Sequence, residues 1–275
     1  MAPVIHLVRH AQGYHNLRLE NQWMRDPDLT DLGKKQCSEL RNTFPYHDKL
    51  THLIASPLRR TIYTCKLSFG DDDDNNKEKK KKKKIIALQD AQEVSLYPCD
   101  VGTDKEKLKE EFGDDEVDFS LVGGDWNDKS PESDNFPEPG KLETRTRRAR
   151  LWLRDLVKQQ TGDADEDAHV VLVTHGGILH FITEDWRGIA SGHGTGWQNT
   201  EYRSYEFADK TGQDPNASLK ELPESINRRG AHEETEPTDA EMRAMRDAFE
   251  NNLAEEVQVC LEKISRQQQQ QEAAA

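Results

Sequence analysis

Cysteine is scarce in this 275-residue sequence, and its four cysteines are widely spaced. None of them forms a CxxC pair, so the sequence predicts neither a disulfide framework nor a structural zinc site. Each is expected to be a small buried thiol. The four are Cys37, Cys65, Cys99 and Cys260.

Long apolar runs are also missing. No stretch approaches the roughly 18 to 20 consecutive apolar residues that a membrane span requires. The N-terminus has no basic region followed by a long apolar run, which is the pattern of a secretory signal. We therefore expect a cytoplasmic protein without a membrane partner.

Positive charge is in deficit, with 38 Lys and Arg residues against 52 Asp and Glu, a formal net charge of −14. Such a charge opposes non-specific binding to nucleic acid, so we expect no nucleic-acid partner. Residues 71–84 (DDDDNNKEKKKKKK) carry a lysine run that leaves nuclear import open as an alternative. The segment has no apolar residue to bury, and we expect a disordered loop there.

The apolar residues that are present come in short runs typical of buried strands. Residues 4–8, 53–55 and 170–173 are continuously apolar rather than alternating, as are parallel strands covered on both faces. Helical periodicity follows over about 30–44, with Thr30 as the N-cap, and again over about 142–160. The sequence therefore predicts an α/β fold with a doubly wound, mostly parallel sheet flanked by helices.

Two further segments differ in composition from this predicted domain, which we place at residues 1–230. Residues 103–140 are polar, acidic and punctuated by Gly and Pro, and we expect an inserted lid or cap over the site. Residues 231–275 contain a capping box at 238–241, then apolar residues at helical spacing, then a low-complexity tail. We expect an amphipathic helix that packs on the core, with a homodimer contact as the alternative.

Basic and imidazole side chains follow three of the predicted strands. Arg9 and His10 come directly after the first, Arg60 shortly after the second, and His175 after the third. Because the carboxyl ends of parallel strands form the ligand crevice of an open α/β sheet, these side chains should converge. Two histidines and two arginines suit a phosphoryl group. A metal site is disfavoured, since no carboxylate or cysteine lies at ligand spacing near either histidine.

Four segments resemble the motifs of the histidine phosphatase superfamily, the phosphoglycerate-mutase-like proteins, in the family's order. They are residues 7–16 (LVRHAQGYHN), 29–36 (LTDLGKKQ), 56–64 (SPLRRTIYT) and 173–177 (VTHGG). Residues 199–207 (NTEYRSYEF) also resemble the late strand of the fungal and plant phosphatase-like branch. The resemblance covers roughly residues 4–207.

This resemblance implies a phosphomonoesterase that needs no metal and no cofactor and works through a phosphohistidine on His10. A neutral imidazole is a good nucleophile for such a step. The family register makes Arg60, and not Arg59, the phosphate ligand of its motif. The implied phosphate-binding residues are Arg9, Asn16, Arg60, His175 and Gly176.

The resemblance also implies a mid-chain carboxylic acid that protonates the leaving group. Glu93 is the candidate and Asp100 the rival, because the lysine insertion disturbs the spacing. A general acid needs a raised pKa, whereas nearby arginines lower the pKa of a carboxyl group. The sequence leaves this choice open.

The sequence departs from the mutases of the family at two places. Ala11 replaces the usual Gly after the nucleophile, and VSLY follows Glu93 where cofactor-dependent mutases have their substrate-seating Glu-Arg-His-Tyr-Gly stretch. Hydrolysis of a small phosphorylated metabolite is therefore favoured. A phosphoglycerate-type mutase and a non-catalytic phosphate-binding or scaffold module are the alternatives.

Substrate choice is expected to depend on residues 103–140 and on the region from His193 to Trp197. Tyr97, Trp126 and Trp197 are expected in the core, with stacking on the leaving group as the alternative. His15 and His193 are expected either near the substrate or on exposed loops.

Overall fold

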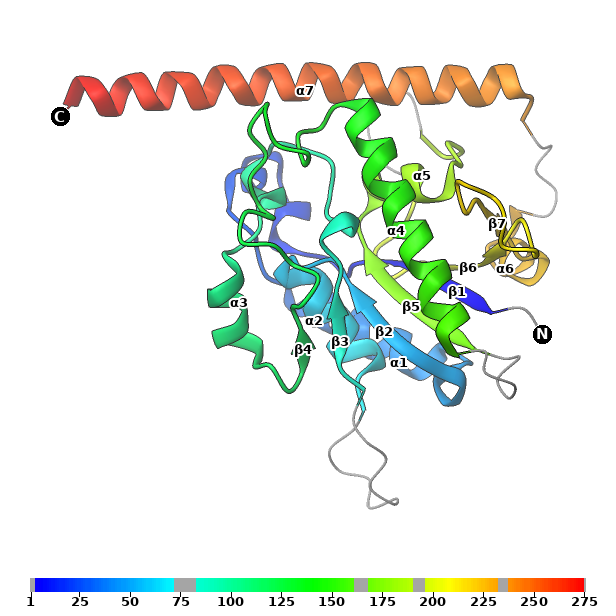
Figure 1. The fold of residues 1–275 in the computed structure, drawn as a ribbon. Helices are drawn as coiled ribbons and strands as arrows, with labels where there is room; N and C mark the ends of the chain where they lie inside the picture. Colours follow the sequence, from blue (N-terminus) through cyan, green and yellow to red (C-terminus); the bar gives the residue numbers. More distant parts are fainter. Residues whose placement is uncertain (1–2, 72–82, 161–167, 190–195, 232–236, 275) are drawn as a thin grey trace.

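The computed structural model describes residues 3–71, 83–160, 168–189, 196–231 and 237–274. The charged run predicted to be disordered lies almost entirely outside these ranges, as does His193. A seven-stranded mixed sheet forms the centre of the fold, with strand order β4-β3-β2-β5-β1-β6-β7 (Figure 1). The strands are β1 (Val4–Arg9), β2 (Leu50–Ala55), β3 (Ile85–Ala87), β4 (Val117–Asp118), β5 (His169–Thr174), β6 (Tyr202–Phe207) and β7 (Leu219–Glu221).

The three predicted strands form the middle of this sheet. β5 lies between β2 and β1 and is parallel to both, and all six of its residues are buried. β3 and β4 extend the parallel part, while β6 runs antiparallel to β1. The continuous apolar runs are thus explained, because both faces of these strands are covered.

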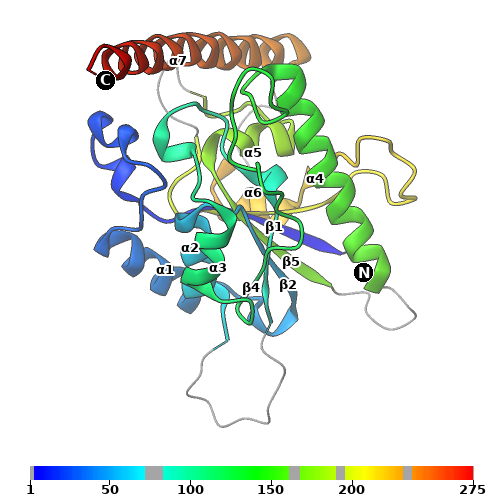
Figure 2. The ribbon, with the colours of Figure 1, turned by 60° about the vertical axis from the view of Figure 1, so that its left-hand side comes forward.

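Helices cover both faces, which confirms the doubly wound prediction (Figure 2). One face packs against α1 (Asp31–Thr43), α2 (Arg59–Phe69) and α3 (Lys105–Phe112). The other packs against α4 (Pro139–Gln160), α5 (Gly176–Thr183) and α7 (Asp239–Ala274). The short α6 (Pro223–Arg228) follows β7, and single 3-10 turns lie at Tyr14–Asn16, Leu19–Trp23, His47–Lys49, Gln89–Ala91 and Pro98–Asp100.

Helix α1 begins where its capping signal predicted and supports the loop that follows β1. The hydroxyl of Thr30 accepts a hydrogen bond from the Gly33 amide at 3.0 Å, as an N-cap does. A Cβ at Gly33 would lie 2.2 Å from the Gln12 carbonyl oxygen. Glycine therefore allows the helix to approach the loop that carries His10.

Residues 103–140 do not form the predicted lid. They supply α3 and the edge strand β4, and most of their large apolar side chains are buried in the core beside α2. Leu121 and Phe136 are partly buried against the other core cluster. Trp126, for example, is 1% exposed and lies within 2 Å of where a Cβ on Gly102 would stand. The segment reads as polar because its few apolar residues are widely spaced, yet each is used for packing.

Helix α7 crosses one end of the domain, at the top of Figures 1 and 2. Its capping box is present: the Glu241 carboxylate accepts from the Thr238 amide at 2.7 Å, and the Thr238 hydroxyl accepts from the Glu241 amide at 3.3 Å. Leu253, Val257 and Cys260 are buried in the same core cluster as α4 and α5. The expectation of a core-packing amphipathic helix is confirmed.

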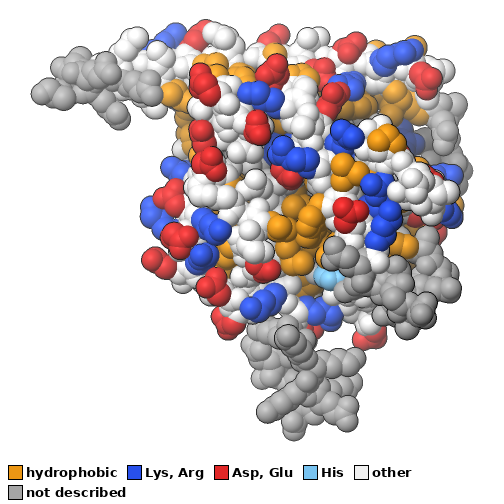
Figure 3. Space-filling model, viewed as in Figure 1, with side chains coloured by type: hydrophobic (Ala, Val, Ile, Leu, Met, Phe, Trp, Pro, Cys, Tyr) orange, Lys and Arg blue, Asp and Glu red, His pale blue; other side chains and the backbone are white. Residues whose placement is uncertain are grey.

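The exposed side of α7 is polar and charged, and the cysteines are buried, as the composition predicts. The outward side of α7 in Figure 3 mixes acidic, basic and polar side chains. All four cysteines are buried and unpaired, as predicted. Within the described ranges, no helix combines the length and apolarity needed to cross a bilayer.

Candidate active site

A cavity of about 250 Å³ lies at the carboxyl ends of the central parallel strands. Arg9 is the last residue of β1 and His10 follows it, while His175 follows β5 and is the N-cap of α5. Arg60 lies in the first turn of α2, shortly after β2. The lining comes from these strand ends, from residues 93–100, from the start of α5 and from α7. The convergence predicted from the three strand ends is therefore present.

His10 is buried and fixed by its own backbone neighbour. Its Nδ1 lies 2.7 Å from the Ala11 carbonyl oxygen, which can only accept, so Nδ1 carries the proton and Nε2 keeps its lone pair. Burial, followed by the charge of Arg60, lowers the pKa of His10 well below its usual value. The Asn199 side chain donates to the His10 carbonyl at 2.9 Å, which holds the loop in place. The result is a neutral imidazole with a free nitrogen.

Arg60 organises the opposite side of the cavity and is only 1% exposed. Its guanidinium donates to the Cys99 carbonyl at 2.6 Å and to Asp100 Oδ1 at 2.7 Å. It also donates to Nδ1 of His175 at 3.0 Å. Because an arginine can only donate, the proton of His175 is on Nε2, which donates to the Ser56 hydroxyl at 2.8 Å. The two active-site histidines are thus held as opposite tautomers.

Three buried nitrogen atoms of lining residues have no hydrogen-bond partner among the described residues. They are Nε of Arg9, Nε of Arg60 and Nδ1 of His15. A buried donor without a partner is rare and calls for one. Two guanidinium N–H groups beside a neutral imidazole are suited to an anionic ligand such as a phosphoryl group.

The two rival carboxylates differ in environment. Burial alone would raise the pKa of Asp100, but the charges of Arg60 and Lys129 hold it below its usual value. Asp100 also accepts from the Ser95 hydroxyl at 2.5 Å. Burial and the negative charge of Asp100 raise the pKa of Glu93. Of the two, Glu93 has the environment of a proton donor.

Glu93 is held at the N-terminus of α5. Its carboxylate oxygens accept from the amides of Gly177 at 3.0 Å, Ile178 at 2.8 Å and Val94 at 3.0 Å. A Cβ on Gly177 would lie 2.7 Å from Glu93 Oε1. The second glycine of the HGG motif is therefore required for this contact, whereas Gly176, which was expected to bind phosphate, is not among the lining residues.

The remaining predicted phosphate ligands take different positions. Asn16 lines the cavity, and its side-chain oxygen accepts from the Gly13 amide at 3.0 Å, which directs its NH₂ group away from Gly13. His175 is fully buried behind the lining, and its ring lies edge-on to His10 at 5.2 Å between centroids.

Sequence reasoning left several lining residues undecided or missed them. His15 lies 5.2 Å from His10 between ring centroids and lines the cavity, and burial lowers its pKa to about 3. Tyr97 also lines the cavity, whereas Trp126 and Trp197 are in the core. Lys129 was not anticipated: its buried ammonium donates to the carbonyls of Glu93 and Ser95 at 2.8 Å each. It ties the segment 103–140 to the Glu93 loop.

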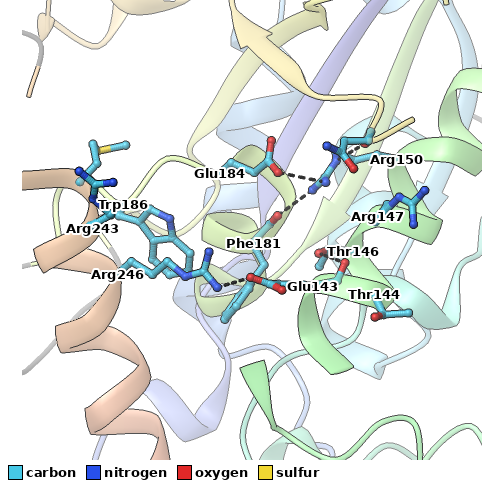
Figure 4. Close-up of a pocket in the computed structure, with 12 residues that line it drawn as sticks. Glu143, Thr144, Thr146, Arg147, Arg150, Phe181, Glu184, Trp186, Arg243 and Arg246 are labelled. Atoms are coloured by element: carbon cyan, nitrogen blue, oxygen red, sulfur yellow. Dashed lines mark hydrogen bonds and ion pairs between the residues drawn. The ribbon is translucent and has the colours of Figure 1, made fainter. Parts of the chain in front are cut away.

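A second cavity of about 530 Å³ lies between α4, α5 and α7 and contains no histidine or cysteine (Figure 4). Its charged side chains include two ion pairs, Arg150 with Glu184 at 3.2 Å and Arg246 with Glu143. Although this cavity is larger, it offers no histidine or cysteine nucleophile, so the cavity at the strand ends is the candidate active site. No group of three or more His, Cys, Asp or Glu side chains in the described ranges is placed to hold a metal ion.

Comparison with known proteins agrees with this geometry. The family model for the histidine phosphatase superfamily (branch 1) matches residues 5–215. Phosphoglycerate mutase-like protein 1 of Arabidopsis thaliana is 26% identical over 261 residues, which cover 81% of this chain and 87% of that protein.

Solved structures are similar at low sequence identity. The ecdysone phosphate phosphatase from Bombix mori, in complex with tungstate, is 12% identical with a TM-score of 0.49 and covers 80% of this chain and 92% of its own. The mycobacterial glucosyl-3-phosphoglycerate phosphatase is 15% identical with a TM-score of 0.47, and the match covers 80% of this chain and 97% of that chain. Such values carry no argument about substrate. The family match over residues 5–215, together with the predicted motifs found around one cavity, establishes that this chain belongs to the histidine phosphatase superfamily.

Proposed function

We propose that this protein is a phosphomonoesterase that forms a phosphohistidine on His10 and transfers the phosphoryl group to water. Membership of the superfamily supports phosphatase or mutase-type activity. The observation that carries the proposal is the neutral His10 ring, oriented by the Ala11 carbonyl, beside unpartnered buried N–H groups of Arg9 and Arg60.

In the first step, Nε2 of His10 attacks phosphorus in line, and the bond from phosphorus to the ester oxygen breaks. Arg9 and Arg60 stabilise the charge on the transferring group, because their N–H groups are already in place before the charge develops. Glu93, whose pKa is raised, gives its proton to the departing oxygen.

In the second step, water attacks the phosphorus of the phosphohistidine. The Glu93 carboxylate takes a proton from that water, the phosphorus–nitrogen bond breaks, and His10 returns to its neutral form with release of phosphate. The amides of Gly177 and Ile178 stabilise Glu93 while it is ionised. The residue therefore alternates between acid and base without moving.

The size of the cavity bears on the class of substrate. About 250 Å³ lies below the range of roughly 300–1,000 Å³ typical of sites for drug-sized ligands. A phosphoryl group occupies part of that volume. The remaining space supports the proposal of a small phosphorylated metabolite.

The test is hydrolysis of p-nitrophenyl phosphate with excess chelator, together with trapping of labelled phosphoenzyme under alkaline conditions. Chelator-resistant turnover and labelling that are both lost in His10→Ala would support the proposal. His52→Gln is the matched control, since His52 lies on β2 and does not line the cavity. Turnover without a label on His10 would contradict the proposal. A folded protein that shows neither turnover nor labelling would contradict it as well.

A further inference from the structure

Helix α7 forms the wall of the catalytic cavity that faces away from the strand ends. Phe249, Asn252, Leu253 and Glu256 all line the cavity. Their spacing of three and four residues places them on one side of the helix. The nucleophile and this wall are therefore separated by about 240 residues of sequence but share one cavity.

Contacts at both ends of the wall hold α7 in place. On one side the Lys263 ammonium lies 3.3 Å from the centroid of the Trp23 ring, and Trp23 packs edge-on against Tyr97 at 5.7 Å. On the other side, Phe249 packs against Trp186 at 5.6 Å, and Arg246 pairs with Glu143 on α4 (Figure 4). The wall is thus a defined part of the site.

The cavity is electrostatically asymmetric. Its cations are Arg9 and Arg60, which come from the strand-end side, and Arg60 is paired with Asp100. Glu256, at the α7 wall, forms no ion pair with any residue of the described ranges. Partial desolvation and the negative charges of Asp100 and Glu93 raise the pKa of Glu256. When ionised, its carboxylate has no cation within ion-pairing distance among the described residues.

We propose that Glu256 is a specificity-determining residue that favours phosphomonoesters with an ammonium group on the leaving group over esters with a second anionic group. The inference rests on the proposed function, because it takes the strand-end side as the phosphoryl site. The cavity has space for a leaving group of only a few atoms, so a charge on it lies close to the α7 wall. A cation there gains Glu256 as a partner, and an anion meets the unpaired carboxylate of Glu256.

The probes are three esters that differ in the charge of the leaving group: O-phosphoethanolamine, p-nitrophenyl phosphate and 3-phosphoglycerate. The variant is Glu256→Gln, which keeps the shape and removes the charge. Glu255→Gln is the matched control, because Glu255 is the adjacent glutamate on the same helix and is exposed like Glu256, but does not line the cavity.

We expect wild type to prefer phosphoethanolamine to 3-phosphoglycerate in kcat/KM. In Glu256→Gln the ratio of kcat/KM for phosphoethanolamine to that for p-nitrophenyl phosphate should fall roughly fivefold, as loss of one partly exposed ion pair does. The ratio for 3-phosphoglycerate should rise by a similar factor. Glu255→Gln should leave both ratios unchanged.

The same preference is measured as binding, with each ester titrated into His10→Ala protein with and without Glu256→Gln. This arm does not depend on turnover, so it separates the two proposals. Equal ratios in wild type and Glu256→Gln, or tighter binding of 3-phosphoglycerate than of phosphoethanolamine, would overturn the role of Glu256. Loss of His10-dependent labelling alone would overturn the phosphohistidine mechanism and leave the binding preference standing.

Discussion

The two ends of the catalytic cavity are built in different ways. At the phosphoryl end, Arg9, His10 and His175 lie at the ends of adjacent parallel strands. The His10 ring is fixed by the Ala11 carbonyl, and the His175 ring is fixed by Arg60. At the leaving-group end, the wall is a helix near the C-terminus that reaches the cavity only by packing. In the proposed mechanism, the chemistry therefore depends on local sequence, and the proposed choice of substrate depends on long-range contacts.

Substitution of Arg60 is expected to have the largest effect at the phosphoryl end. Arg60→Ala removes the buried hydrogen bonds to Cys99, Asp100 and His175 and leaves Asp100 without its ion-pair partner, so we expect kcat to fall about 10²–10³-fold. We also expect a loss of about 3 kcal/mol in the free energy of unfolding, because a buried charge is left unpaired. Steady-state kinetics and urea unfolding measure the two effects.

Arg59→Ala is the control for this substitution. Arg59 follows the same strand but pairs with Glu111 at the surface, at 2.8 Å. Its loss should change kcat less than about threefold, since exposed ion pairs contribute little. Equal effects of the two substitutions would contradict the assignment of the phosphoryl end.

Substitutions of Glu93 and Asp100 test which carboxyl group protonates the leaving group. Glu93→Gln should lower kcat about 100-fold for O-phosphoethanolamine, whose alkoxide needs a proton, and at most about tenfold for p-nitrophenyl phosphate. Asp100→Asn should lower both to a similar extent, because Asp100 acts through Arg60. If Asp100→Asn, rather than Glu93→Gln, discriminates between the esters, the general acid is Asp100.

The pH dependence of kcat for O-phosphoethanolamine also tests whether Glu93 is the general acid. The raised pKa keeps Glu93 protonated above its usual range, and kcat should fall by up to tenfold per pH unit once the pH exceeds that pKa. The lowered pKa of His10 means that the nucleophile stays neutral well below pH 6.5. We therefore expect no acid limb near pH 6.5, and loss of the basic limb in Glu93→Gln. A basic limb that persists in Glu93→Gln would assign the titration to another group.

The smallest effect on rate is expected at the packed side of α7. Val257 is 9% exposed and does not line the cavity, so Val257→Ala should lower the free energy of unfolding by about 2 kcal/mol with kcat for p-nitrophenyl phosphate changed less than about twofold. Val259, on the same helix, is 54% exposed, and Val259→Ala should cost less than about 0.5 kcal/mol. Equal costs in urea unfolding would show that α7 does not pack as described.

Much of the fold followed from local patterns. The apolar runs at 4–8, 53–55 and 170–173 predicted the central strands, because the side chains on both faces of a covered strand are buried and therefore apolar. The capping residue Thr30 and the capping box at 238–241 predicted where α1 and α7 begin, because a helix start depends on neighbours within four residues. These signals are local, so they survive without knowledge of the tertiary fold.

Other features were decided only by tertiary contacts. The polar composition of residues 103–140 predicted a lid. Burial depends instead on where the few apolar side chains lie in the fold, and Trp126 lies in the core. His15 could be read as an exposed loop residue until its ring was found beside His10. Nothing in the sequence near Glu256 links it to a site at the N-terminus.

The sequence by itself determined which groups can perform the chemistry: a histidine, two arginines and a second histidine delivered by strand ends, whose shared edge follows from the parallel sheet. Only the tertiary structure decided the protonation states of the groups around the cavity and which charged side chains lie beside them. The pKa of Asp100 is lowered because Arg60 and Lys129 lie beside it, and the pKa of Glu93 is raised because it is buried near another negative charge. Such shifts depend on distance and burial, which belong to the folded chain and not to the order of its residues.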